Sequence, residues 1–137
     1  MNHPILEDVD WVEKRANCSV GQLFEQLKQR VDDDVKARGR QIPSPTTDYP
    51  SLTFDSKARS FTVTLDGFKP YVHKSVVFNL AHPKILVSDE EGKHILEATA
   101  SLGDDGRCLL KTNGDALEIW QFCRRALEDL FFTSGLP

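Results

Sequence analysis

The side chains that could carry out chemistry in this chain are few and far apart. The three cysteines, Cys18, Cys108 and Cys123, form no Cys-x-x-Cys pair. A reactive thiol needs a lowered pKa, which a helix N-terminus can supply, and only Cys18 directly precedes a predicted helix. Cys123 belongs to the apolar stripe of another predicted helix, where a thiol behaves as a small hydrophobic group. The pattern therefore favours three free thiols in a reducing compartment.

Metal ligands and catalytic bases are equally sparse. His73, His82 and His94 are scattered, and no His-x-His or His-x-x-x-His pattern occurs. The acidic residues 32–34 lie between two apolar positions of a predicted helix, which is typical of a solvated helix face. We therefore predict no metal and no cofactor. For an enzyme with catalytic residues dispersed in the sequence, His73 or His94 beside a carboxylate would be the starting point.

Motifs that bind phosphate or nucleic acid are missing. No Gly-x-Ser-x-Gly, Gly-x-Gly-x-x-Gly or Walker lysine pattern occurs. Seventeen Lys and Arg against 21 Asp and Glu give a net charge of −4, whereas nucleic-acid binding requires a basic face. We expect no nucleic-acid partner, and because no catalytic motif is found we favour a protein that is not an enzyme.

The hydropathy pattern predicts no membrane association. No stretch approaches the ~18 consecutive apolar residues that a membrane-spanning helix needs. Residues 1–10 carry Glu7, Asp8 and Asp10 and lack the cationic flank of a signal peptide. We expect a cytoplasmic location.

The 137 residues fit one domain, which we predict to be α+β. An N-terminal segment, 1–18, could form a short helix. Residues 19–39 form a clear helix, with a capping box at Ser19 and Gln22 and Gly39 as its expected end. Its apolar stripe consists of Val20, Leu23, Phe24, Leu27, Val31 and Val35. A proline-rich linker, 40–50, follows.

The apolar period then changes from helical spacing to two. Residues 51–112 predict six successive strands, and their short turns allow only an antiparallel meander. Asp115 and Glu118 form a second capping box, which opens a long apolar C-terminal helix over residues 115–132. We expect this helix to pack on the sheet.

Function is predicted from apolar residues that this core does not obviously need. Phe68 lies at a turn, Leu117 and Phe122 lie at the edges of the apolar face of the last helix, and Phe132 lies outside that face. Several such residues together can mark a contact surface. They predict a small binding or regulatory module that acts through a protein partner or through self-association as a homodimer.

A second hypothesis is a carrier or sensor of a small apolar ligand. Gaps between a sheet and a helix are natural pockets. Phe61 and Phe78 on the strands and Trp120 on the last helix would line such a pocket. An enzyme with dispersed residues is the third hypothesis.

Overall fold

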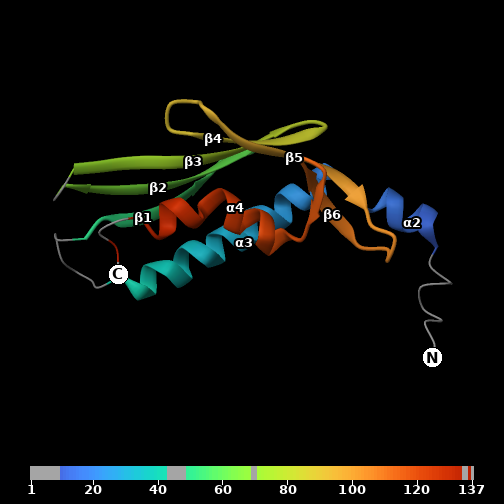
Figure 1. Cartoon of the computed structure of the whole chain (residues 1–137), viewed down its shortest axis with the longest axis horizontal. Helices are drawn as coiled ribbons and strands as arrows, with labels where there is room; N and C mark the ends of the chain where they lie inside the picture. The colour runs from blue at the N-terminus through green and yellow to red at the C-terminus, as the bar shows by residue number, and fades with distance from the viewer. Residues whose placement is uncertain (1–9, 43–48, 69–70, 134–135, 137) are drawn as a thin grey trace.

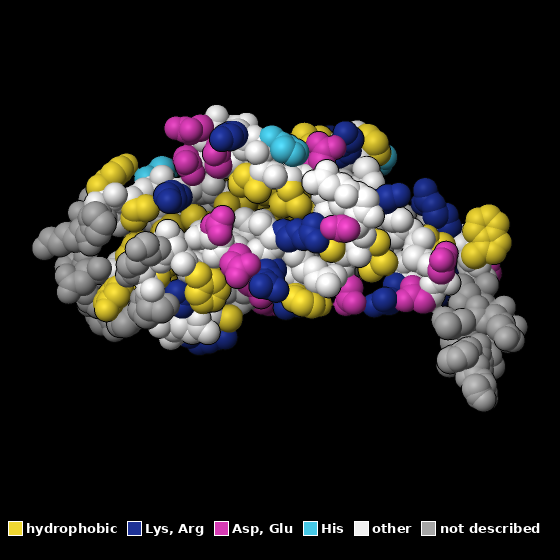
Figure 2. Space-filling model, in the orientation of Figure 1, with side chains coloured by type: hydrophobic (Ala, Val, Ile, Leu, Met, Phe, Trp, Pro, Cys, Tyr) yellow, Lys and Arg dark blue, Asp and Glu magenta, His cyan; other side chains and the backbone are white. Residues whose placement is uncertain are grey.

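The computed structural model describes residues 10–42, 49–68, 71–133 and 136 of the chain. One antiparallel sheet forms the first layer, and two helices that run beneath it form the second (Figure 1). The predicted α+β architecture is confirmed. Acidic and basic side chains are mixed over the face seen in Figure 2, with hydrophobic side chains between them.

In the described part of the chain, helices α2 and α3 precede the sheet. Helix α2 covers Trp11–Ala16, has Asp10 as its N-cap and buries none of its residues. Helix α3 covers Val20–Gln41, and the Ser19 hydroxyl caps it by accepting from the Gln22 N–H. Among the residues described, no helix is long and apolar enough to cross a membrane.

Helix α3 extends beyond the end that the sequence predicts. Gly39 lies inside the helix, and the C-cap is Ile42, which is extended at φ −90° and ψ 126°. Ile42 precedes a proline, and the proline ring disfavours helical geometry in the residue before it. The expected end at Gly39 is therefore wrong, because the proline sets the boundary.

The sheet has seven strands in the order β1-β2-β3-β4-β5-β6-β7, each antiparallel to the next. Their bounds are β1 Ser51–Ser56, β2 Ser60–Phe68, β3 Tyr71–Ala81, β4 Lys84–Asp89, β5 His94–Leu102, β6 Cys108–Thr112 and β7 Asp115–Leu117. The order confirms the predicted meander. The sheet curves, so that β5 and β6 bend down beside the helical layer (Figure 1).

Strand β7 corrects the predicted count of six strands. Residues Asp115–Leu117 pair with β6, and the intervening turn has positive φ at Asn113 (48°) and Gly114 (85°). Asn-Gly is the favoured pair for a tight hairpin whose two central residues both need positive φ. Helix α4 consequently covers Ile119–Phe131, with Glu118 as N-cap and Gln121 completing the capping box.

The core between the two layers contains a line of aromatic rings. Phe61 of β2 and Phe78 of β3 are stacked, with ring centroids 4.5 Å apart. Phe24 of α3 contacts Phe61 at 5.1 Å, and Phe122 of α4 contacts Phe78 at 6.5 Å. Such ring pairs add to the free energy gained by burial, so both helices are fixed to the same two strands.

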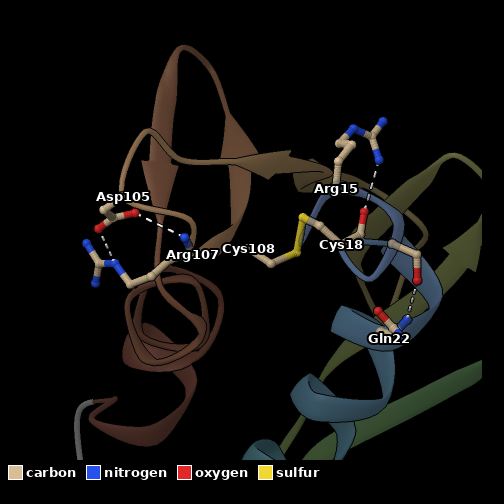
Figure 3. The surroundings of a disulfide bond; sticks show 7 residues. Arg15, Cys18, Gln22, Asp105, Arg107 and Cys108 are labelled. Atoms are coloured by element: carbon tan, nitrogen blue, oxygen red, sulfur yellow. Dashed lines mark hydrogen bonds and ion pairs between the residues drawn. A yellow bond between two sulfur atoms is a disulfide. The ribbon is translucent and has the colours of Figure 1, made fainter. Parts of the chain in front are cut away.

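A disulfide joins Cys18, between α2 and α3, to Cys108 at the start of β6 (Figure 3). Cys18 is buried, and its carbonyl oxygen accepts a hydrogen bond from Arg15 at 3.2 Å. The expectation of three free thiols is wrong, because 90 positions of sequence separate two residues that the sheet brings together. Cys123 is a free, buried thiol.

Candidate functional site

A groove of about 330 Å³ lies between α3 and α4 and is here called the α3–α4 groove. Its α3 wall consists of Arg30, Asp34, Ala37, Arg38 and Gln41. Its α4 wall consists of Trp120, Cys123, Arg124, Leu127, Glu128, Phe131 and Phe132. This volume lies at the lower end of the range typical of ligand pockets.

Two aromatic side chains of the groove remain largely in solvent. Trp120, in the first turn of α4, is 45% exposed, and Phe132, at the C-cap, is 62% exposed. The rise of a helix places these positions about 18 Å apart along α4. Between them Leu127 and Phe131 are buried and form an apolar floor. The groove therefore presents two exposed aromatic groups and a floor that is already packed.

Arg38 connects the two walls. It is only 4% exposed, and its Nε donates to the carbonyl oxygen of Phe131 at 2.7 Å. A second nitrogen donates to Gln41 Oε1 at 3.0 Å, and the guanidinium lies 4.3 Å from the centre of the Phe132 ring. A cation at a helix C-terminus is stabilised by the helix dipole and by carbonyl groups that lack helical partners. Arg38 therefore fixes the end of α4 against α3 and supports the Phe132 ring.

Charge along the groove is more positive than over the chain as a whole. Arg30 pairs with Asp34 at 3.1 Å on α3, and Arg124 pairs with Glu128 at 3.1 Å on α4. With Arg38 the lining holds three arginines against two carboxylates, while the whole chain carries −4. An approaching acidic group therefore meets less repulsion at the groove than over an average part of this surface.

Cys123 lies beneath the groove and is not available for chemistry there. Burial is the main cause that raises the pKa of its thiol to about 12, and the nearby Asp34 carboxylate raises it further. A neutral buried thiol is a poor nucleophile, because the thiolate is the reactive form. The groove is therefore suited to binding by shape and charge.

The residues predicted to form an interface are placed differently from one another. Phe132 is exposed and lines the α3–α4 groove. Leu117 and Phe122 are buried in the core, so the expectation that they lie at an open edge is wrong. Phe122 contacts Phe78, because α4 packs on the sheet through the edge of its apolar face that carries Phe122. Phe68 ends β2, and its side chain lies outside the described part of the chain.

The residues predicted to line a ligand pocket do not surround a common space. Phe61 and Phe78 are fully buried and stack on each other, so they fill the space between the layers. Trp120 lies away from them, on the side of α4 that faces the α3–α4 groove. The contacts of these three residues lend no support to an apolar cavity between sheet and helix.

The histidines and acidic residues named from the sequence are also separated. His73 Nδ1 lies 3.3 Å from Asp66 Oδ1, and both side chains are about half exposed, at 47% and 50%. Strand β4 separates β3, which carries His73, from β5, which carries His94. Among the residues described, no cluster of three His, Cys, Asp or Glu side chains could hold a metal.

The acidic run at residues 32–34 is a helix face with local partners. Its three carboxylates each interact with a residue four positions away on α3: Asp32 with Lys36, Asp33 with Gln29, and Asp34 with Arg30. These pairs satisfy the carboxylates within one helix, so the interpretation as a solvated helix face is confirmed for this run.

Arg38 is the groove residue that the sequence analysis missed. Arg38 lies in the last turn of α3, where a cation suits the helix dipole. A stronger signal was available, because Arg38 continues the apolar stripe three positions after Val35. A charge on a buried stripe requires a partner, and here that partner is the carbonyl of Phe131.

Comparison of the chain with family models, with curated proteins and with solved structures finds no match. The function is therefore inferred from the residues of the site.

Proposed function

We propose that this chain is a small binding module that receives a segment of a protein partner in the α3–α4 groove. The observation that carries the proposal is the pair of exposed aromatics, Trp120 and Phe132, held above a packed floor and beside three arginines. Tryptophan and arginine are enriched among the residues that contribute most to the affinity of protein interfaces. The partner segment carries bulky apolar side chains and acidic neighbours.

The length of the groove defines the segment further. The two aromatics lie about 18 Å apart, which corresponds to about 12 residues of a helix. An amphipathic helix that lays its apolar face into a groove is a common mode of peptide recognition. Partner carboxylates would approach Arg30 and Arg124, whose own ion pairs lie on helix surfaces and exchange at little cost.

Two synthetic amphipathic peptides of about 12 residues test this proposal. Both carry Leu and Phe at helical spacing and no tryptophan, and they differ only in having Glu or Lys on the polar face. In a Trp11→Phe background Trp120 is the single tryptophan, so its emission reports on the groove. We expect saturable binding of the Glu peptide and weaker binding of the Lys peptide.

Variants of the aromatic residues complete the experiment. Phe132→Ala should weaken the Glu peptide at least ~10-fold, as expected for a residue central to an interface. Tyr71→Ala removes an exposed aromatic of β3 outside the groove lining and should leave the affinity unchanged. Equal binding of both peptides, or equal affinity for Phe132→Ala and the parent protein, would overturn the proposal.

A cytoplasmic location stays a prediction from the sequence, and the disulfide argues against it. Disulfides are rare in proteins of the reducing cytosol and common in oxidising compartments. Alkylation of acid-quenched cells decides the question: modification of Cys18 and Cys108 supports the cytoplasm, and their protection supports an oxidising compartment.

A further inference from the structure

The two edges of the sheet differ in how they end. Strand β7 is three residues long and follows a tight turn, so it offers little backbone to another strand. Strand β1 is six residues long, and in the described part of the chain it pairs only with β2. Four of its six residues have exposed side chains. Of the two edge strands in the described part of the chain, β1 is the one long enough to accept a further strand.

The register of β1 shows which backbone groups are available. The Lys57 N–H donates to the Ser60 carbonyl, which makes these residues a hydrogen-bonded pair. Hydrogen-bonded pairs alternate along an antiparallel ladder, so Asp55, Thr53 and Ser51 direct their N–H and C=O groups toward β2. The groups of the alternate residues therefore point outward, and these residues are Leu52, Phe54 and Ser56.

This edge has little of the usual protection against pairing, since Asp55 is the one charged residue of β1. Natural sheets protect their edges with charged residues, prolines or bulges. None of the outward-bonding residues Leu52, Phe54 and Ser56 is charged or a proline, and the β1–β2 register runs without a bulge. Leu52 and Phe54 pack against the core but are only partly buried, and no strand of the described residues lies beyond them.

We propose that β1 pairs with β1 of a second copy of this chain, antiparallel, about a two-fold axis at Thr53. Leu52 of each copy then lies opposite Phe54 of the other, and these residues exchange the N–H and C=O groups that point outward. The same Leu52–Phe54 pairs place the apolar cores of the two copies side by side. On the outer face Thr53 meets Thr53, and Ser51 lies opposite Asp55. The Thr–Thr pair is of a kind that stabilises antiparallel sheets, and the Leu–Phe pairs bring apolar side chains together on the core face.

Other registers of the β1–β1 pairing are less favourable than the register with its axis at Thr53. An axis at Asp55 would place two carboxylates opposite each other. An axis at Leu52 would place Pro50, which has no N–H, opposite Phe54. An axis at Phe54 would leave Leu52 opposite the polar Ser56. The axis at Thr53 avoids the paired carboxylates and the Leu52–Ser56 pair, and it places Pro50 opposite Ser56 at the end of the strand. There the missing N–H removes a terminal hydrogen bond, whereas an axis at Leu52 would remove one beside the central pair.

The dimer is compatible with ligand binding in the α3–α4 groove, since no β1 residue lines that groove. Self-association through β1 is independent of the proposed peptide binding, and each can fail without the other. In the two-fold dimer the β1 edge of each copy is paired with the β1 edge of the other, so assembly stops at two copies.

Cysteine cross-linking tests the register directly. Paired Thr53 residues would form a non-hydrogen-bonded pair with Cα atoms about 4.5 Å apart, within the range for a disulfide. Thr53→Cys should therefore form a covalent dimer on mild oxidation. The matched control Asp55→Cys lies two positions off the axis in each copy, so its Cα atoms would be about 14 Å apart and it should stay monomeric. Cross-linking of Asp55→Cys in preference to Thr53→Cys would overturn the register.

Sedimentation equilibrium tests the association without a cross-link. The parent chain should approach twice its 15.5 kDa mass as the concentration rises toward about 500 μM. Thr53→Lys brings two ammonium groups together at the axis and should raise the dissociation constant at least ~10-fold. Ala116→Lys, at an exposed position on the opposite edge, should behave as the parent. A parent chain that stays monomeric, or equal effects of both lysines, would overturn the proposal.

Discussion

The Nε atom of Arg38 on α3 donates a hydrogen bond to the backbone carbonyl of Phe131, which ends α4, at a distance of 2.7 Å. The two residues are 93 positions apart in the sequence. This hydrogen bond helps to join α3 to α4, which also pack together through buried side chains, and the Phe132 ring lies over the same guanidinium. The geometry of the α3–α4 groove therefore depends on Arg38.

Replacing Arg38 tests this dependence. Arg38→Ala should lower the free energy of unfolding by about 2–3 kcal/mol, because it removes a charge-assisted hydrogen bond and leaves a carbonyl without its partner. Arg38→Lys keeps the charge but loses the planar fork, and it should recover only part of the loss. Urea denaturation measures both variants. Arg40→Ala, at an exposed position of the same helix turn, is the control and should stay within about 0.5 kcal/mol of the parent. Equal stability of Arg38→Ala and the parent would contradict the role given to Arg38.

The disulfide should contribute strongly to stability. A link that closes a loop of 90 positions restricts the unfolded chain, and the chain-entropy relation gives about 4–5 kcal/mol. Reduction, or the double variant Cys18→Ala/Cys108→Ala, should lower the midpoint of urea unfolding accordingly. Reductant should have no further effect on the double variant. Thiol titration of the unfolded, unreduced parent should find one thiol, that of Cys123, and a count of three would refute the bond.

Cys123 should make stability depend on pH in the alkaline range. Burial raises the pKa of its thiol from 9.0 to about 12 in the folded state. Below pH 9 both states keep the proton, so stability is unaffected there. Above pH 9 the unfolded state loses its proton first, which favours unfolding by about 1.4 kcal/mol per pH unit until the folded thiol also titrates. Urea unfolding at pH 8, 9 and 10 should therefore show a steeper alkaline decline for the parent than for Cys123→Ala. Parallel declines would contradict the buried neutral thiol.

An alanine substitution at Gly39 tests where α3 ends. The matched control is Gly114, which lies in the turn before β7. A Cβ atom added at either position meets no atom within 4 Å, and only Gly114 has a positive φ, at +85°. Gly39→Ala should therefore stabilise the protein by about 0.5–1 kcal/mol, because alanine favours the helix interior. Gly114→Ala should destabilise it by about 1 kcal/mol, because alanine resists positive φ. Thermal unfolding monitored by circular dichroism distinguishes the two. A destabilising Gly39→Ala would mean that the helix ends at Gly39 after all.

Local patterns in the sequence predicted most of the fold. The alternation around Phe61 and Phe78 located two central strands, and Ser19 marked the start of α3. Strand β7 was missed because three residues are too few to display a period of two. The Asn113–Gly114 pair is typical of a hairpin, whereas the spacing of Asp115 and Glu118 is typical of a helix start. The two local patterns therefore disagree about the residues that follow Gly114.

The candidate site was less predictable, because it depends on how two distant helices lie together. Helical spacing placed Trp120 and Phe122 near the same apolar face, and it could not tell which edge of that face the sheet covers. The sheet covers Phe122, and Trp120 borders the groove. The pairing of Cys18 with Cys108 depends in the same way on the curvature that brings β6 to the start of α3.

The disulfide also divides the two walls of the groove between different parts of the chain. Helix α3 lies within the loop closed by Cys18 and Cys108, whereas α4 lies beyond it. Tension applied between α2 and the end of α4 would pass through the sulfur bridge. The residues between Cys18 and Cys108 would then carry no load. Such a pull would peel α4 and β7 away first and separate Phe132 from Arg38, while β1 to β5 stayed folded. The groove would therefore open under a mechanical load that leaves the strands inside the disulfide loop in place.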